Sequence, residues 1–529
     1  MFVEHLPTAP FHAYWLLGIA ALLAGAGWLL SRRQRSPNLP TLRISQRPGQ
    51  LGVADDIAMF LNDNRRFMSV GYERYSKHGK NYMVQLPTSK EVVVAPKFLD
   101  EVRSAPQSHV SNLDANMETM QFVHTLHPVL AKDQYHMFDP IKKSLTRSLG
   151  PRLPDIVEEG RMSLDKFVGR PKDWAPYNVT DVSFSVITQT ANRLLFGPDL
   201  ARDEEFMDLS IKHTGTVFGG ANTIRHWPEI LKPLIMWWKT GIYREQAVAR
   251  RILGPILKDR IATEEMYRRE GREAEWAKIK PSDVMQWVLD ITPPWKKQVD
   301  LLVLRMLNVN IAAIHTSSTT FVDVIVLVAL TPEIHDELRE EIERVFAAEG
   351  GWTKQALTYL MKVDSVMTEA VRVTGGINSV RLTRKTIKDW TMSDGTFLPK
   401  GTRFSIPAYH RLRDPDFVEN AEKFDCFRMY RRRQDPEKAN QHQFVMTSED
   451  NLHFGHGINA CPGRFFAANE VKTLLVWMLM RYEIRMDFPG GLEKAIEGTW
   501  VGWDRVPPSG TIQLKDRSHL IPESVRKHF

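Results

Sequence analysis

The spacing of apolar and polar residues predicts a mostly helical protein. In 332–348 apolar residues recur at helical spacing, Thr331 suits the N-cap, Pro332 suits the first helical position, and Gly350 ends the run. The longest such stretch is 299–330, which at about 1.5 Å per residue crosses a whole domain. We therefore expect helices to dominate the body of the chain.

Strand signals are few and short. Segments rich in β-branched and aromatic residues flank turn sequences at 82–86, 92–95, 389–392, 396–398 and 403–408. The Pro- and Gly-rich stretch 489–508 indicates a terminal loop or hairpin. The predicted fold class is mainly α with a small β region, in one catalytic domain over 49–529.

The long helix 299–330 is apolar enough for a membrane span to be considered as an alternative. Polar side chains lie along its whole length, namely Arg305, Asn308, Asn310, His315, Asp323 and the hydroxyl run 316–320. Such groups are costly in lipid, so a buried central helix is the favoured interpretation.

The amino terminus carries a clearer membrane signal. Residues 11–30 are nearly free of charge and match the length that spans a bilayer as a helix, and a basic flank follows at 32–35. The positive-inside rule places this flank and the chain after it on the cytoplasmic side. We predict a lumenal leader over 1–10, a transmembrane anchor over 11–30 and a basic, proline-rich linker over 31–48. A cleaved signal peptide is the alternative, but its charges would precede the apolar run.

Composition excludes several classes of protein. The chain has 529 residues, of which 43% are hydrophobic and 25% charged, enough to bury a large core. Its two cysteines, Cys426 and Cys461, exclude a disulfide framework and a cysteine-rich zinc site, and indicate a reducing compartment. The net charge of +7 is spread among acidic residues without a nucleic-acid motif, so we expect no nucleic-acid partner.

Cys461 is the residue most strongly marked for chemistry. It lies in FGHGINACPGR, 454–464, directly before a long apolar helical stretch. Gly455 and Gly463 let the backbone close around a sulfur atom, and Pro462 suits the first turn of the helix that follows. The positive end of that helix favours a thiolate. A buried structural cysteine is the alternative.

The spacing of Phe454, Gly457, Cys461 and Gly463 resembles the haem-binding signature of the cytochromes P450, which is aromatic, any two, Gly, any three, Cys, any, Gly. In that family the cysteine thiolate is the axial ligand of haem iron. The resemblance implies that Cys461 binds the iron of haem b, with Phe454, Gly455 and Gly463 also holding the cofactor. It also implies the P450 fold, preceded by one N-terminal transmembrane helix.

Two further segments resemble motifs of this family and occur in its order. Glu369 and Arg372 match Glu-x-x-Arg, and 424–428 resembles the aromatic-x-x-Arg segment. A helical wheel alone places Glu369 and Arg372 on a solvated face. The resemblance instead implies a buried structural triad of Glu369, Arg372 and Arg428 beneath the haem loop. Cys426 is expected to be a small buried hydrophobe.

The resemblance also implies cations for the haem propionates. Arg381 stands nine residues after the Glu-x-x-Arg motif, where members often place such an arginine; a strand-edge charge is the alternative. The family's Trp-x-x-x-Arg motif near residue 130 is absent, which leaves His136, Lys142 and Lys143 as candidate substitutes. Asn459 stands where Arg or His is common.

Residues 312–316, Ala-Ala-Ile-His-Thr, resemble the oxygen-binding segment Ala/Gly-Gly-x-Asp/Glu-Thr. Thr316 takes the place of the threonine that organises proton delivery, and a helical threonine can bend its helix by bonding back to a carbonyl. His315 replaces the usual acid and is a candidate proton relay, because its ordinary pKa is about 6.5. A merely packed threonine is the alternative.

The function implied is that of a fungal-type microsomal monooxygenase of the endoplasmic reticulum membrane, with its catalytic domain in the cytosol. It would insert one oxygen atom from O2 into a lipophilic molecule, with electrons from NADPH through a separate NADPH–cytochrome P450 reductase, since the chain has no flavin or nicotinamide motif. Cytochrome b5 is a further candidate partner. The expected substrate is a terpenoid or meroterpenoid of secondary metabolism; the alternatives are an alkaloid or polyketide, or a haem-thiolate isomerase or dehydratase that needs no reductase.

By the same analogy, the substrate pocket is expected to be shaped by 108–122, 308–316 and 374–380. Within these segments Asn310 and Asn378 are candidates to orient a hydroxyl or carbonyl group of the substrate.

Overall fold

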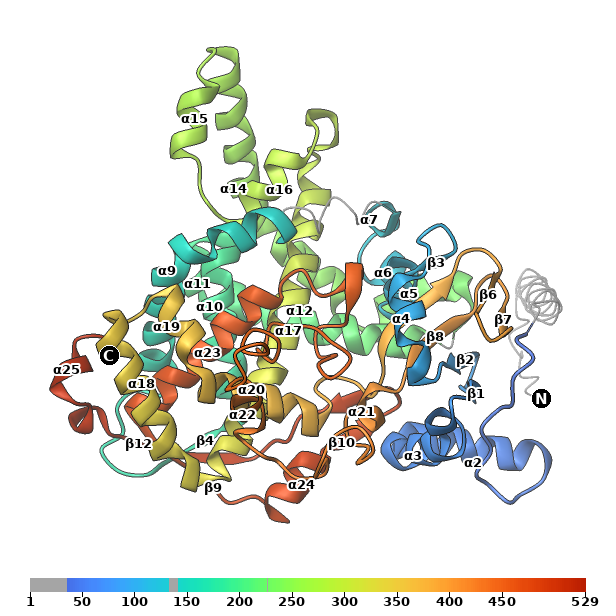
Figure 1. The fold of residues 1–529 in the computed structure, drawn as a ribbon. Coiled ribbons are helices and arrows are strands. Elements are labelled where there is room, and N and C mark those ends of the chain that lie inside the picture. The colour runs from blue at the N-terminus through green and yellow to red at the C-terminus, as the bar shows by residue number, and fades with distance from the viewer. Residues whose placement is uncertain (1–35, 133–140, 226) are drawn as a thin grey trace, which may run out of the picture.

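The computed structural model describes residues 36–132, 141–225 and 227–529. The predicted leader and anchor, 1–30, lie outside these residues, and so does His136. Within the described part the protein is mainly helical with small sheets, as the sequence predicts (Figure 1).

The helical body is built around α17, Val299–Ala329, which packs against α10, α12, α14, α20 and α23. The long helices of this body are α9 (Thr146–Phe167), α10 (Val179–Phe196), α12 (Glu204–Ile224), α14 (Ile242–Arg269), α18 (His335–Glu349), α20 (Met361–Thr374) and α23 (Arg464–Arg481). In Figure 1, α14 and α15 project beyond this body at the top of the view.

Shorter helices complete the fold. They are α2 (Gly49–Asn62), α3 (Asn64–Arg74), α4 (Leu99–Ser104), α5 (Asn112–Thr119), α6 (Phe122–Thr125), α7 (Pro128–Lys132), α11 (Pro198–Arg202), α13 (Lys232–Lys239), α15 (Glu273–Ile279), α16 (Val284–Ile291), α19 (Lys354–Tyr359), α21 (Ala408–Arg411), α22 (Arg428–Arg432), α24 (Gly491–Glu497) and α25 (Glu523–Arg526).

The largest sheet has the order β1-β2-β8-β5-β3 and lies at the right of Figure 1, on the side of the first described residues. Its strands are β1 (Tyr82–Gln85), β2 (Lys90–Val93), β3 (Val110–Ser111), β5 (Arg381–Thr386) and β8 (Arg403–Ile406). A second sheet has the order β4-β12-β9, from Ala175–Asn178, Thr511–Asp516 and Tyr482–Met486. Two hairpins pair β6 (Trp390–Thr391) with β7 (Phe397–Leu398), and β10 (Thr499–Val501) with β11 (Asp504–Val506).

All five predicted strand segments contain strands, and the described residues form several small sheets. The sequence pattern does not reveal β5, because three of its six residues, RLTRKT, are arginine or lysine. The stretch 489–508 contains the predicted hairpin and, in addition, the helix α24.

The interpretation of α17 as a core helix is confirmed. It is the one described helix long and apolar enough to cross a bilayer, and most of it is buried inside the protein. It ends at Ala329, one residue before the predicted end.

The start of α18 differs from the prediction. Residues Pro332–Ile334 form a 3-10 turn, and the α-helix begins at His335. The hydroxyl of Thr331 does not cap it but donates to the carbonyl of Leu327 at 2.8 Å. A threonine hydroxyl can accept from an amide at the start of one helix or donate to a carbonyl near the end of another. Here it donates to a carbonyl near the end of α17.

A fully buried ion pair ties α17 to the hairpin β10–β11. The Arg505 Nη1 donates to Asp323 Oδ1 at 2.6 Å, and neither side chain is exposed. The hydroxyl of Thr374, at the end of α20, donates to the other carboxylate oxygen at 3.1 Å. Because water does not reach the pair, each charge depends on the other for compensation.

We expect Arg505→Met to lower the free energy of unfolding by about 3–5 kcal/mol, because it leaves the Asp323 charge buried without its partner. The double variant Asp323→Leu/Arg505→Met removes both charges and is expected to recover most of that loss in urea unfolding followed by circular dichroism. Arg485→Met, at an exposed arginine of β9, is the control and is expected to stay within about 0.5 kcal/mol. Equal losses in the single and double variants would show that packing, rather than charge, is responsible.

Candidate functional site

The segment 454–464 forms a closed loop at the start of α23. The backbone amide of Cys461 donates to the carbonyl of Phe454 at 2.8 Å. Gly455 and Gly457 adopt φ of 70° and 78°, the left-handed region that favours glycine. At Gly457 a side chain would also lie only 3.2 Å from the carbonyl oxygen of Arg103. The loop therefore depends on both glycines for its shape.

The sulfur of Cys461 lies at the positive end of α23. Burial raises the pKa of its thiol, while hydrogen bonds from the backbone amides of Gly463 and Arg464, together with the Arg464 charge, act in the opposite direction. Backbone N–H donors aimed at one sulfur suit a thiolate ligand of a metal. Pro462 precedes the N-cap, Gly463, so the prediction that it lies in the first turn of the helix is wrong.

Cys426 has a different environment. It is 7% exposed, and burial raises the pKa of its thiol to about 12. Its sulfur therefore stays protonated and packs in the core, as expected for a small hydrophobe.

On α17 the segment 312–316 is less buried than the rest of the helix. Side chains 302–311 and 317–329 are buried, whereas Ala312 is exposed and His315 and Thr316 are half-buried. The Thr316 hydroxyl donates to the carbonyl of Ala312 at 2.8 Å, and Thr320 donates to the carbonyl of Thr316 at 2.9 Å. Side-chain bonds of this kind can bend a helix.

His315 points into an aromatic environment. Its ring lies 4.7 Å from that of Phe218 on α12 and 5.8 Å from that of Phe184 on α10. Burial lowers the pKa of its imidazole, and no charged group among the described residues counters that effect. The ring is therefore neutral near pH 7, and it lies on α17 beside Thr316 in sequence without a hydrogen bond to it within the described structure.

Glu369, Arg372 and Arg428 form one buried network. Arg372 donates to both Glu369 oxygens, at 2.7 and 2.8 Å, and Arg428 Nε donates to Glu369 Oε1 at 3.0 Å. The other guanidinium nitrogens bind backbone carbonyls of a segment without regular structure, those of Leu412, Glu419, Asn420, Ala421 and Lys423. The helical-wheel expectation of a solvated pair is wrong, because that segment covers the second face of α20.

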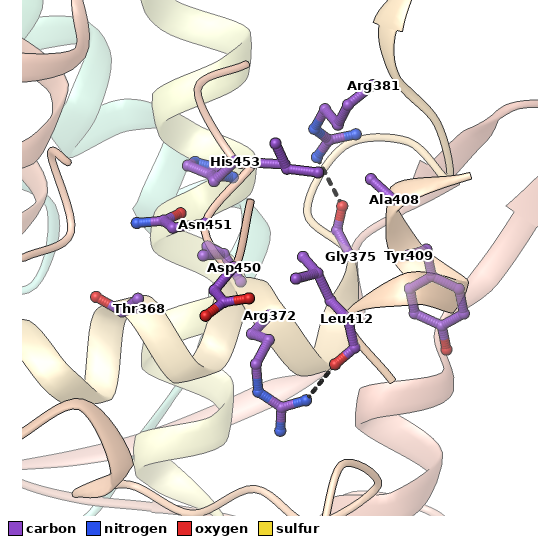
Figure 2. Close-up of a pocket in the computed structure, with 12 residues that line it drawn as sticks. Thr368, Arg372, Gly375, Arg381, Ala408, Tyr409, Leu412, Asp450, Asn451 and His453 are labelled. Atoms are coloured by element: carbon purple, nitrogen blue, oxygen red, sulfur yellow. Dashed lines mark hydrogen bonds between the residues drawn. The ribbon is translucent and has the colours of Figure 1, made fainter. Parts of the chain in front are cut away.

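Arg381 lies across a small pocket from this network (Figure 2). Its guanidinium donates to the carbonyl of Gly375 at 2.8 Å and to the side chain of Asn378. Burial lowers its pKa to about 10. The neighbouring ring of His453 is neutral, because burial and the Arg381 charge lower its pKa to about 3.

Arg384 lies on β5, three residues after Arg381, and no motif in the sequence pointed to it. Burial lowers its pKa to about 10 as well, and its Nη1 donates to the carbonyl of Thr383 at 3.0 Å. Within the described residues neither Arg381 nor Arg384 forms an ion pair with a carboxylate. Two buried guanidinium groups without carboxylate partners would suit the two carboxylates of the haem propionates. A second arginine three residues after Arg381, in the sequence RLTRKT, is the signal that could have identified Arg384.

A cavity of about 170 Å³ lies between these arginines and the cysteine loop. It is lined by Asn112, Asn116, Ile377, Asn378, Val380, Arg381, Leu382, Thr383, Arg384, His453, Gly455, His456 and Asn459. Arg381, Gly455 and Asn459 thus line one cavity.

Other candidates from the sequence lie elsewhere. Lys142 and Lys143 are exposed in the turn Ile141–Leu145, and neither is among the described residues that line the cavity. Asn310 donates to Asn192 and Ser210, at 3.2 and 3.0 Å, within the packed core of three helices. The expectation that Asn310 orients a substrate is therefore wrong, because its amide joins α17 to α10 and α12.

Comparison with known proteins identifies the family of this chain. The sequence model of the family described as Cytochrome P450 matches residues 59–509. Cytochrome P450 monooxygenase AN1598 of Emericella nidulans is 33% identical over 79% of this chain and 77% of that protein. Cytochrome P450 monooxygenase olcJ of Penicillium canescens is 32% identical over 76% and 75%, and esdpI of Penicillium shearii is 29% identical over 90% and 91%.

If Arg384 binds a propionate, Arg384→Leu should lose haem at least about tenfold faster than the parent protein, because a charged hydrogen bond contributes about 1.5–3 kcal/mol and 1.4 kcal/mol corresponds to tenfold. Haem transfer to excess apomyoglobin measures this rate. Lys385→Met, which removes the next cation on β5 and its ion pair with Glu118, is the control. A rate unchanged in Arg384→Leu would remove Arg384 from the cofactor site.

The environment of His315 predicts a dependence of stability on pH. The unfolded chain binds a proton at this residue below about pH 6.5, whereas the folded chain keeps it neutral, so acidification favours unfolding by up to about 1.4 kcal/mol per pH unit. Wild type is therefore expected to lose more unfolding free energy than His315→Phe between pH 7.5 and pH 5.5. If the difference in unfolding free energy between wild type and His315→Phe is the same at both pH values, the imidazole is not held neutral by burial.

Proposed function

This chain belongs to the cytochrome P450 family and is a P450 monooxygenase; we propose that it binds haem b through Cys461 and transfers one oxygen atom from O2 to a lipophilic small molecule. The observation that carries the proposal is the sulfur of Cys461, held in a glycine loop at the positive end of α23. Haem iron bound to that sulfur supplies the activation of oxygen.

Several residues would together hold the cofactor. Cys461 would bind the haem iron, Phe454, Gly455 and Gly463 would shape the loop around it, and Arg381 and Arg384 would neutralise the propionates. The network of Glu369, Arg372 and Arg428 fixes the irregular segment beneath that loop by binding its carbonyls. Removing one member would leave a buried charge uncompensated, so we assign this triad a structural role.

Thr316 and His315 are assigned to proton handling. The Thr316 hydroxyl donates to the carbonyl of Ala312, and its half-buried oxygen can accept a proton. His315 is a neutral imidazole with one N–H, so it can relay a proton by accepting at one nitrogen and donating from the other.

Electrons are proposed to come from NADPH through NADPH–cytochrome P450 reductase, with cytochrome b5 as a further candidate donor. The predicted anchor, 11–30, would hold the protein as a single-pass protein in the endoplasmic reticulum membrane with residues 49–529, the catalytic domain, in the cytosol. The apolar length of that run supports this arrangement.

The proposed substrate is a terpenoid or meroterpenoid intermediate of fungal secondary metabolism, by analogy with fungal members of the family. The fungal origin of the relatives supports the fungal type of enzyme. A polyketide or an alkaloid of similar polarity is the alternative.

The decisive experiment is the spectrum of the reduced protein under carbon monoxide. We expect the red-shifted absorption typical of thiolate-bound haem in the parent protein, and its loss with haem retained in Cys461→His. Cys426→Ser, at the other cysteine, is the control and is expected to keep the shift. A normal spectrum in Cys461→His would exclude this sulfur as the ligand.

Turnover of a lipophilic substrate should then require both NADPH and the reductase. Product formed at an undiminished rate without them would favour the alternative of a haem-thiolate isomerase or dehydratase.

A further inference from the structure

The hairpin β10–β11 presents a carboxylate beside valines on its outer face. Its inner face carries Trp500 and Arg505, which are buried in the core. Asp504 lies on the outer face, directly opposite Val501 in the strand register, and its side chain is exposed. Val501 and Val506 on the same face are 52% and 48% exposed. The outer face therefore combines uncovered hydrocarbon with a hydrogen-bond acceptor.

The other edge of β11 pairs with the segment before β5. Asp504 and Asn378 form an antiparallel bridge there, and two backbone hydrogen bonds of 2.9 and 3.0 Å flank it on either side. In such a pair without hydrogen bonds of its own, the two side chains lie close together on one face. Asn378 lines the cavity of about 170 Å³ that extends to Gly455 of the cysteine loop. Asp504 is therefore next to this cavity.

The carboxylate of Asp504 has no hydrogen bond or ion pair with any residue that the structure describes. Burial raises the pKa of its carboxyl, and the charge of Arg225 is the group that opposes this effect. Exposure together with a pKa raised by burial means that water reaches the side chain while protein surrounds it on most sides. Its lone pairs are thus available to a small molecule.

Arg225, at the end of α12, supplies the opposite charge. Its Nη2 donates to the carbonyl of Thr119, the last residue of α5, at 2.9 Å. The same helix lines the cavity through Asn112 and Asn116. Among the described residues Arg225 forms no ion pair with a carboxylate, so it reaches Asp504 only through its electrostatic field.

The other charges that act on Arg225 are already paired. Arg403 binds Glu91 at 3.0 Å, and Glu118 binds a lysine of β5. Arg225 and Asp504 remain, so the group of charges is neutral overall. A neutral O–H donor satisfies the carboxylate without changing that balance, whereas an ammonium group would add a positive charge that protein surrounds. A hydroxyl group is therefore the favoured ligand.

We propose that Asp504 selects a lipophilic alcohol as substrate: the hydroxyl group donates a hydrogen bond to the Asp504 carboxylate, and the hydrocarbon part contacts Val501 and Val506. This inference rests on the proposed monooxygenase function and narrows its substrate class. A site built to bind a substrate hydroxyl discriminates strongly against an analogue without one, because the polar group of the protein would stay unpaired. The molecule therefore carries its hydroxyl group before this enzyme acts on it.

Matched probes test the selection. They are sesquiterpene and diterpene alcohols, each with the hydrocarbon and the amine of the same skeleton. Affinity is measured from the rise in Tm that each probe causes and from the change in haem absorption. We expect the parent protein to bind alcohols at least about tenfold more tightly than the matching hydrocarbons and amines, because a hydrogen bond to a charged acceptor contributes at least that factor.

Variants of Asp504 assign the preference to this residue. Asp504→Val keeps a residue suited to a strand but removes the acceptor, so it is expected to bind alcohol and hydrocarbon equally. Asp504→Asn keeps an uncharged acceptor and is expected to retain part of the preference. Asp487→Val, at an exposed aspartate that follows β9, is the matched control and is expected to leave the preference unchanged.

The outcomes separate this inference from the proposed function. Alcohols that bind the parent protein no more tightly than hydrocarbons, or a preference that survives Asp504→Val, overturn the assignment of Asp504. Amines that bind more tightly than alcohols, with the difference lost in Asp504→Val, overturn the alcohol class in favour of a cation. A parent protein without the red-shifted carbon monoxide spectrum refutes the haem-thiolate function instead, and the Tm measurements report on Asp504 independently of that spectrum.

Discussion

One sulfur atom held at the positive end of a helix is the constraint on which the structure depends. A thiolate in a protein interior needs backbone donors or a metal beside it, and the loop before α23 supplies the donors through Gly463 and Arg464. That loop closes only because Gly455 and Gly457 can adopt left-handed backbone angles. The surrounding elements keep this loop in place and provide space for a flat cofactor beside it.

Buried charges fix the parts of the molecule that lack regular structure. Arg372 and Arg428 share the carboxylate of Glu369 and also bind the carbonyls of the segment between α21 and α22. Asp323 and Arg505 join α17 to the hairpin β10–β11 in the same way. Each pair is stable because both charges are satisfied, so these contacts determine geometry more than they add stability.

The central helix α17 has two chemically distinct sides at the level of Thr316. Toward α10 and α12 lie the aromatic rings around His315, and toward α23 lies the carboxyl group of Glu470. Neither group has an opposite charge beside it in the described structure, so burial is the main influence on their protonation states. This arrangement keeps charge out of the core.

The sequence by itself determined the fold class, the central helix and the candidate ligand, because helical periodicity and the spacing around Cys461 are local properties of the chain. It could not determine which face of α20 is buried, since Glu369 and Arg372 look solvated until a segment more than 40 residues away covers them. For the same reason it gave no indication that Arg384 lacks a carboxylate, that Asn310 joins three helices, or that Glu470 has no cation. Burial and pairing of charges depend on distant parts of the chain, and only the tertiary structure decides them.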